Sequence, residues 1–112
     1  MIARIEQYAR YTVVNCEENR LDSICAPAFI LYVKKNVGAE RQAVILDLSL
    51  VEFMDSSGVG AIVSIFKSLN SKVSFFLCGA GENVKSLLDL TGISKLFETY
   101  PDKKTAEQAL AS

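Results

Sequence analysis

The chain has 112 residues, the length of a single domain (residues 1–112), and it is long enough to bury a core without metals or disulfides. Its 12 basic and 13 acidic side chains give a net charge of −1, without the basic cluster that nucleic acid requires. Since no apolar stretch reaches the roughly 18 to 20 residues of a membrane span and no signal peptide is evident, we expect a cytoplasmic protein that binds neither nucleic acid nor membranes.

The chain contains no histidine, which removes the usual activating base of serine and cysteine nucleophiles and the commonest metal ligand. The three cysteines, Cys16, Cys25 and Cys78, lack paired spacing, so we expect reduced thiols rather than a disulfide or a metal site. A phosphate-binding GxxxxGK[ST] loop is also missing from the sequence. We therefore expect no metal and no cofactor.

The N-terminal part is predicted to form a hairpin followed by a helix. Two stretches, 2–7 and 11–16, have the apolar pattern of short strands joined by a tight turn, and the polar residues 17–20 indicate a loop. A helix is expected from 26 to about 37, where Pro27 falls in the first turn and is tolerated. Its apolar residues have the spacing of one buried face: Phe29, Ile30, Val33 and Val37.

The rest of the chain alternates strands with helices. In order, we expect a strand at 43–48, a helix at about 57–69, a strand at 72–78, a helix at 82–90, an extended piece at 97–100 and a closing helix at 102–111. This order favours a mixed, partly parallel sheet with crossover helices. The predicted fold class is therefore α/β, with an N-terminal β-hairpin and about four helices.

Two stripes are predicted on the helix at 57–69. The core stripe is expected to comprise Val59, Ile62, Val63, Phe66 and Leu69. A second stripe of small, mildly polar residues lies away from it: Ser57, Ala61, Ser64 and Ser68. Because a solvated face would normally carry Lys and Glu, and only Lys67 is charged nearby, we interpret this second stripe as a docking face.

The segment before this helix, DSSG at 55–58, allows two interpretations. Ser and Asp are favoured helix N-caps, so the segment could be a plain helix cap. Gly58 and Gly60, however, each cost about 0.5 to 1 kcal/mol in a helix, which a cap alone does not require. Glycines permit close approach of another backbone, within this fold or from a partner. The alternative is therefore a serine hydroxyl that another protein addresses.

A phosphate on a first-turn serine would be tolerated by the fold, because free N–H groups and the helix dipole favour negative charge there. It would add about −1.5 to −2 charge and considerable bulk. Against a partner surface matched to Asp55 and a small hydroxyl, that charge would oppose docking. The residues alone do not separate Ser56 from Ser57.

The segment VILDLSLVEFMDSSGVGAI closely resembles the STAS domains of bacterial anti-sigma factor antagonists. Two further segments agree, RLDSICAPAF at 20–29 and LTGI at 90–93, so that the resemblance covers nearly the whole chain. It implies a sheet with the main helices packed on one face, and a non-catalytic, partner-switching function.

The resemblance also implies the partners. A member of this family binds a serine kinase of the histidine-kinase-like ATPase superfamily, which often doubles as the anti-sigma factor. The kinase phosphorylates the first serine after the aspartate, here Ser56, and a PP2C-type phosphatase reverses the modification. Together with the small-residue stripe, it predicts these partner-binding residues: Asp22, Met54, Asp55, Ser56, Ser57, Gly58, Val59, Gly60, Ala61 and Ser64.

The sequence departs from the family pattern at two positions. Arg20 replaces a residue that is usually glutamate, which changes the charge at the rim of the expected docking surface. Cys25 stands where a threonine often begins the first helix. The lost cap hydroxyl should cost about 0.5 to 2 kcal/mol unless another group, for which Ser23 is the candidate, replaces it.

Two other functions compete with a phosphorylation-controlled binding module. The first is a constitutive STAS subunit of a transport or signalling assembly, in which Ser56 is never modified. The second is an enzyme with Ser56 as nucleophile, for which Lys67 would have to act as the base. Lys67 lies about three turns away on the expected helix, which disfavours the enzyme.

Overall fold

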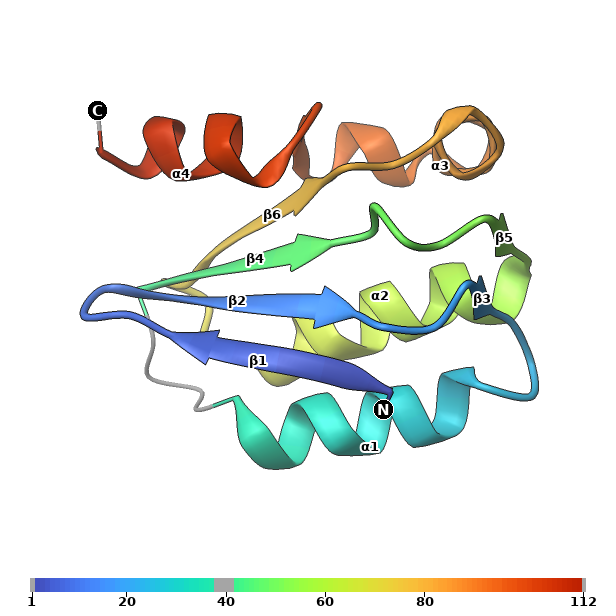
Figure 1. Ribbon diagram of the computed structural model, residues 1–112, viewed down its shortest axis with the longest axis horizontal. Coiled ribbons are helices and arrows are strands. Elements are labelled where there is room, and N and C mark those ends of the chain that lie inside the picture. The colour runs from blue at the N-terminus through green and yellow to red at the C-terminus, as the bar shows by residue number, and fades with distance from the viewer. Residues whose placement is uncertain (1, 38–41, 112) are drawn as a thin grey trace.

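A computed structural model describes residues 2–37 and 42–111 (Figure 1). The strands are β1 (Ala3–Gln7), β2 (Tyr11–Cys16), β3 (Arg20–Leu21), β4 (Ala43–Asp47), β5 (Phe53–Met54), β6 (Ser74–Cys78) and β7 (Glu98–Tyr100). The helices are α1 (Ala26–Asn36), α2 (Ser56–Ser68), α3 (Glu82–Thr91) and α4 (Lys103–Ala111), with a short 3-10 helix η1 (Ile93–Lys95). Among the described residues, no helix is long and apolar enough to cross a bilayer.

Five strands form the main sheet in the order β1-β2-β4-β6-β7. The β1–β2 hairpin is antiparallel, and β2, β4, β6 and β7 run parallel to one another. The parallel connections require crossovers, and α1, α2 and α3 supply them. The predicted α/β class, the N-terminal hairpin and the mixed sheet are all confirmed.

Helices cover both faces of the sheet, unequally. The large core cluster joins α1, α2 and α3 to one face, through buried side chains such as Phe29, Ile62 and Leu88. A smaller cluster joins α4 to the other face, where Ala106 packs with Val13, Ile45 and Cys78. The main helices therefore lie on one face as predicted, and the closing helix covers the other.

The buried side of α2 differs from the predicted core stripe. Phe66 is 41% exposed, whereas Ile65 is buried, and so is Ala61, which was expected on the docking face. The physical reason is that α2 packs against α1 as well as against the sheet, and so buries a wider arc than a single stripe. Ala61 is fully buried within that core cluster.

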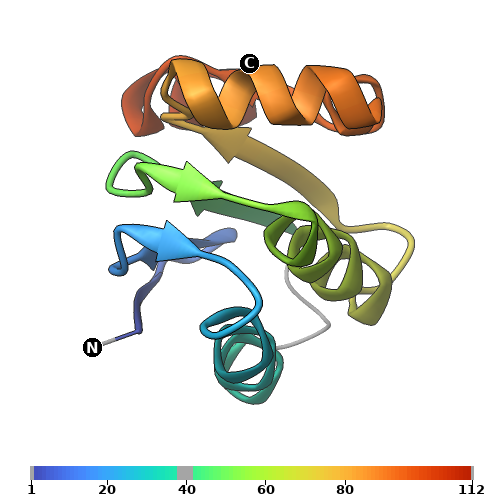
Figure 2. The same ribbon diagram turned by 90° about the vertical axis from the view of Figure 1, so that its right-hand side faces the viewer.

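A second, two-stranded parallel sheet joins β3 to β5, with Arg20 opposite Phe53 and Leu21 opposite Met54. The sequence predicted a loop up to Arg20 and no strand at 53–54. Strands of two residues show no periodicity, because one alternation of apolar and polar residues is not a pattern. This small sheet lies at the end of the molecule where α1 and α2 begin (Figures 1 and 2).

Candidate functional site

The DSSG segment follows the central strand β4, and internal hydrogen bonds hold the connecting loop. The carboxylate of Asp47 accepts from the backbone N–H of Ser49 at 2.9 Å and from its hydroxyl at 2.7 Å. Leu48 is buried, and its N–H donates to the carbonyl of Cys78 at 2.9 Å. The loop therefore leaves the sheet in a fixed direction.

The small sheet then fixes the start of α2. The N–H groups of Glu52 and Phe53 both donate to the carbonyl of Asn19, at 2.7 and 3.2 Å, and β5 pairs with β3 immediately afterwards. Asp55 follows directly on β5, so the first turn of α2 is positioned by backbone hydrogen bonds to the segment before α1.

Asp55 is the N-cap of α2. Its Oδ1 accepts from the N–H of Ser57 at 2.9 Å and from that of Gly58 at 3.2 Å. The cap is therefore the aspartate, and neither serine side chain is needed for it. The DSSG segment does cap the helix, as its first interpretation predicted, and because Asp55 supplies the cap, both serine hydroxyls remain available for the second interpretation.

The two serines differ in their exposure. Ser56 is exposed at the first position of α2, and Ser57 is half-buried. Neither hydroxyl has a hydrogen-bond partner among residues 2–37 and 42–111. Exposure thus distinguishes two side chains that the residues alone left equivalent, and Ser56 is the more accessible of the two.

Gly58 and Gly60, in the first turns of α2, differ in their surroundings. A Cβ on Gly58 would collide with the carbonyl oxygen of Leu21 in β3 and would lie 2.5 Å from the Cγ of Met54. Gly58 therefore allows α2 to approach β3. The backbone that comes close to this glycine belongs to the fold itself and not to a partner. Gly60 is exposed, and a Cβ there would meet nothing within 4 Å.

Arg20 and Asp22 form an ion pair beside this turn. Arg20 Nε donates to Asp22 Oδ2 at 2.9 Å, and the guanidinium carbon lies 5.0 Å from the ring centroid of Phe53. This hydrogen bond holds the pKa of the Asp22 carboxyl below its usual range, although burial opposes the shift. Arg20 is thus a fixed cation at the rim of the site rather than a freely moving one.

Asp22 holds the turn that leads into α1, but it does not cap that helix. Its Oδ1 accepts from the N–H of Ile24 at 3.1 Å and from that of Cys25 at 3.2 Å. The expectation that Ser23 replaces the cap hydroxyl is wrong, because no side chain of the described residues caps α1. The Asp22 carboxylate lies four positions before Ala26, the first residue of α1, so it binds the N–H groups of the preceding turn and not those of the helix.

Several residues expected to touch a partner are buried in the chain. They are Asp22, Met54, Gly58, Val59 and Ala61. These residues lie beneath the surface at the start of α2, so a partner would not contact them directly. Of the remaining predicted residues, Ser56 and Gly60 are exposed, and Asp55, Ser57 and Ser64 are half-buried.

The structure adds surface residues that the sequence analysis missed. Ile24, just before α1, is 84% exposed, and Phe53, in β5, is 45% exposed. Large apolar side chains on the surface are a usual mark of interaction sites when they gather near one another. The signal available in the sequence was the apolar identity of both residues in segments that the sequence did not predict to be helix or strand.

A shallow hollow extends the site along α2. It is lined from α2 by Gly60, Ser64 and Lys67, among others, and from α1 by Lys34. Ser64 of the predicted docking face thus lines this surface hollow, whereas Ala61 of the same predicted face is buried. Lys67 belongs to the last turn of α2, while Ser56 begins that helix. At about 1.5 Å per residue the two are roughly 16 Å apart, too far for Lys67 to act as a base for Ser56.

No group of three or more Cys, Asp or Glu side chains with the arrangement of a metal site occurs in the part of the chain that the structure describes. Cys16 and Cys78 are buried free thiols, and burial raises their pKa values to about 11 and about 12. Neither thiol is therefore activated as a nucleophile.

Comparison with known proteins shows the family of this chain and some of its relatives. The STAS domain family matches residues 3–106. An anti-sigma F factor antagonist of Paenibacillus polymyxa is 34% identical over 64 residues, which are 56% of this chain and 55% of that protein. An anti-sigma-B factor antagonist of Listeria monocytogenes is 39% identical over 54 residues, 47% of each chain. The chain thus spans about half the length of the curated relatives it matches.

The fold agrees over a longer stretch. The crystal structure of an anti-sigma factor antagonist from Mycobacterium paratuberculosis superposes with a TM-score of 0.88 at 26% identity. The superposition covers 98% of this chain and 93% of that chain.

Proposed function

The chain belongs to the STAS domain family, and on that premise we propose that it is an anti-sigma factor antagonist whose binding is controlled by phosphorylation of Ser56. In the unphosphorylated state it binds an anti-sigma factor that is also a serine kinase. Phosphorylation releases it, and dephosphorylation restores binding. The names of its relatives and its nearly complete likeness to a solved antagonist support this function.

The observation that carries the proposal is the exposed Ser56 hydroxyl beside an aspartate cap. Asp55 already occupies the N–H groups of Ser57 and Gly58. A phosphate on Ser56 cannot take those same donors, so it has to extend outward from the helix end. The modification therefore changes the surface that a partner meets and leaves the hydrogen bonds of the cap in place.

The electrostatic effect on the fold is expected to be small. The dipole of α2 favours an anion at its N-terminus by about 0.3 to 1 kcal/mol, and the neighbouring Asp55 carboxylate opposes it. At the interface the balance is different, because a doubly charged group would be desolvated against a surface that had accommodated a hydroxyl. Phosphorylation is thus nearly neutral for folding and strongly unfavourable for docking.

The docking surface is centred on Ser56. Exposed apolar groups of Ile24 and Phe53 lie at the same end of the molecule, Gly60 leaves room for close approach, and Arg20 adds one cation at the rim. The partner proposed for it is a serine kinase of the histidine-kinase-like ATPase superfamily, and a PP2C-type phosphatase is proposed for the reverse reaction. The chain itself needs no catalytic group for this role.

The experiment is incubation with the purified cognate kinase and Mg-ATP, followed by intact-mass and peptide mass spectrometry. We expect one added phosphate, on Ser56. Ser56→Ala should accept none, and the matched variant Ser57→Ala should accept one. A phosphate on Ser57, or none with a kinase that binds the chain, would contradict the proposal. The second of these results would favour a constitutive STAS subunit.

A further inference from the structure

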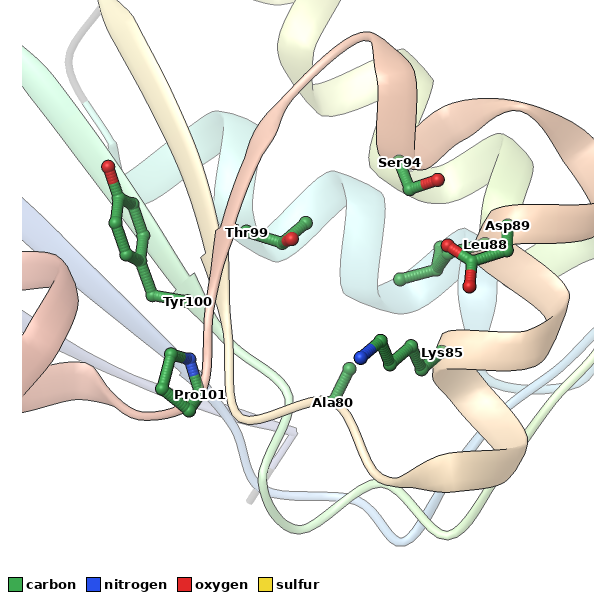
Figure 3. A pocket seen from close by; sticks show the side chains of 8 residues that line it. All are labelled: Ala80, Lys85, Leu88, Asp89, Ser94, Thr99, Tyr100 and Pro101. Carbon is green, nitrogen blue, oxygen red and sulfur yellow. The ribbon is translucent and has the colours of Figure 1, made fainter.

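A separate hollow of about 300 Å³ lies between α3 and the edge strand β7 (Figure 3). We call it the α3–β7 pocket; its polar lining is Lys85 and Asp89 of α3, Ser94 of η1 and Thr99 of β7. Ala80, two residues after β6, and Tyr100 and Pro101, at the end of β7, complete its wall. Ligands of open α/β sheets bind outside the carboxyl ends of the strands, and this pocket occupies such a position.

The charged groups of the pocket have no side-chain partners among the residues that the structure describes. Lys85 and Asp89 are one helical turn apart, a spacing at which opposite charges commonly pair. Yet no ion pair or side-chain hydrogen bond involves either of them within residues 2–37 and 42–111. Figure 3 shows both side chains extending from α3 toward the space that Thr99 faces from β7.

The hydroxyls of Ser94 and Thr99 are likewise without a hydrogen-bond partner in the described chain. The ring of Tyr100 lies on the other side of its strand, where it packs against Phe76, so it does not fill the space (Figure 3). One cation, one carboxylate and two hydroxyls are therefore available in a single hollow, and the buried side chain of Leu88 adds an apolar surface.

We propose that the α3–β7 pocket binds a small zwitterion of the α-amino acid type. Its carboxylate would meet the Lys85 ammonium, and its own ammonium would meet the Asp89 carboxylate. Each contact would be a charge-assisted hydrogen bond, the stronger kind. A short aliphatic side chain would lie against Leu88. The site does not include Ser56, so the inference goes beyond the proposed function and does not depend on it.

The size of the pocket limits the ligand. Pockets for drug-sized molecules span about 300 to 1,000 Å³, and this one is at the lower end. A ligand of about six non-hydrogen atoms can reach a dissociation constant in the millimolar range at such an open site.

The test is a titration of the isotope-labelled full chain, followed by amide chemical shifts, with three probes of nearly identical shape. L-Alanine carries both charges, L-lactate replaces the ammonium by a hydroxyl, and propionate lacks the second group. We expect saturable shifts at residues 80–101 with L-alanine, weaker binding of L-lactate and the weakest of propionate. Shifts that do not saturate with L-alanine by about 50 mM, or equal binding of all three probes, would overturn the proposal.

Variants separate the pocket from a general surface effect. Lys85→Met and Asp89→Asn should each weaken L-alanine binding about tenfold. Lys95→Met removes an exposed lysine of η1 that does not line the pocket, and it should bind as the unchanged chain does. Because Lys85 and Asp89 are exposed, these variants should fold, which the amide spectrum reports directly. Unchanged affinity in Lys85→Met would overturn the proposal.

Discussion

Gly58 in the first turn of α2 lies against the carbonyl oxygen of Leu21 in β3, so closely that no side chain fits between them. This contact ties the helix that presents Ser56 to the segment that leads into α1. The small β3–β5 sheet, the Asp55 cap and Gly58 together hold the serine at a defined place.

The first prediction concerns this contact. Gly58→Ala should destabilise the fold by about 1 to 3 kcal/mol or more, because the obstacle is backbone and cannot turn away. The matched variant Gly60→Ala meets nothing and should stabilise α2 by up to about 1 kcal/mol. Urea unfolding of both variants measures the difference. Equal stabilities would show that Gly58 is not needed for packing.

The second prediction concerns Ser64, which lines the hollow along α2. Ser64→Arg should fold normally, within about 0.5 kcal/mol, and should weaken binding of the partner kinase because it fills the hollow next to Gly60. Ser71→Arg, at an exposed turn beyond the other end of α2, is the matched control and should bind normally. Kinase binding that is unaffected by Ser64→Arg would place the interface elsewhere.

Ala61→Arg should instead unfold the chain, since it would bury an unpaired charge in the core cluster. This reverses what the small-residue stripe predicted from the sequence. A thermal melt distinguishes the two arginine variants without any partner present, and a normal melt of Ala61→Arg would contradict the assigned packing of α2.

The burial of Ala61 has a physical reason that hydrophobic periodicity does not capture. Hydrophobic periodicity predicted the position of α2 well, because its thirteen residues contain enough apolar positions to define a helix. It did not decide which small residues are exposed, since serine and alanine occur both on docking faces and where helices pack closely. Burial of Ala61 depends on how α2 sits between α1 and the sheet, which is set by the whole fold.

The candidate site was also only partly predictable from the sequence. The motif with Asp55 and Ser56 was recognisable in the sequence, and its place at a strand-to-helix junction is confirmed. The roles of Asp22 and Arg20 were not predictable, because they depend on the β3–β5 pair, and two-residue strands leave no pattern. The exposure that distinguishes Ser56 from Ser57 also required coordinates.

A third prediction concerns Thr12 in β2. Its hydroxyl is fully buried and has no hydrogen-bond partner among the described residues. Thr12→Val should therefore stabilise the chain by about 1 kcal/mol, because an unpaired buried polar group carries a desolvation cost. Thr12→Ser, which keeps the hydroxyl and removes the methyl, should destabilise it by a similar amount. Thermal or urea unfolding decides, and a less stable Thr12→Val would indicate that the hydroxyl is satisfied.

The fourth prediction is the pH dependence of the Asp22 ion pair. The pKa of Asp22 is lowered in the folded state, chiefly by the hydrogen bond from Arg20. Its contribution to stability is therefore complete above the unfolded-state value of about 3.9 and is lost as the pH falls through the folded-state pKa. Asp22→Asn should be less stable than the unchanged chain at neutral pH, and the difference should shrink in acid.

Urea unfolding at about pH 7 and about pH 3 measures this difference. Glu52→Gln is the control, because Glu52 is exposed and its side chain has no hydrogen bond or ion pair among residues 2–37 and 42–111. A stability loss in Asp22→Asn that is the same at both pH values would mean that packing, rather than charge, accounts for the effect.

The most direct test of the phosphorylation switch is calorimetric titration of the purified partner kinase, in the presence of nucleotide, with the chain unmodified and with it fully phosphorylated on Ser56. A single carboxylate carries less charge than a phosphate, so Ser56→Asp serves only as a partial mimic. We predict tight binding of the unmodified chain and of Ser56→Ala, weaker binding of Ser56→Asp, and a loss of at least about a hundredfold, or ~2.7 kcal/mol, for the phosphorylated chain. Equal affinity of the unmodified and phosphorylated chains, with both folded, would contradict the account.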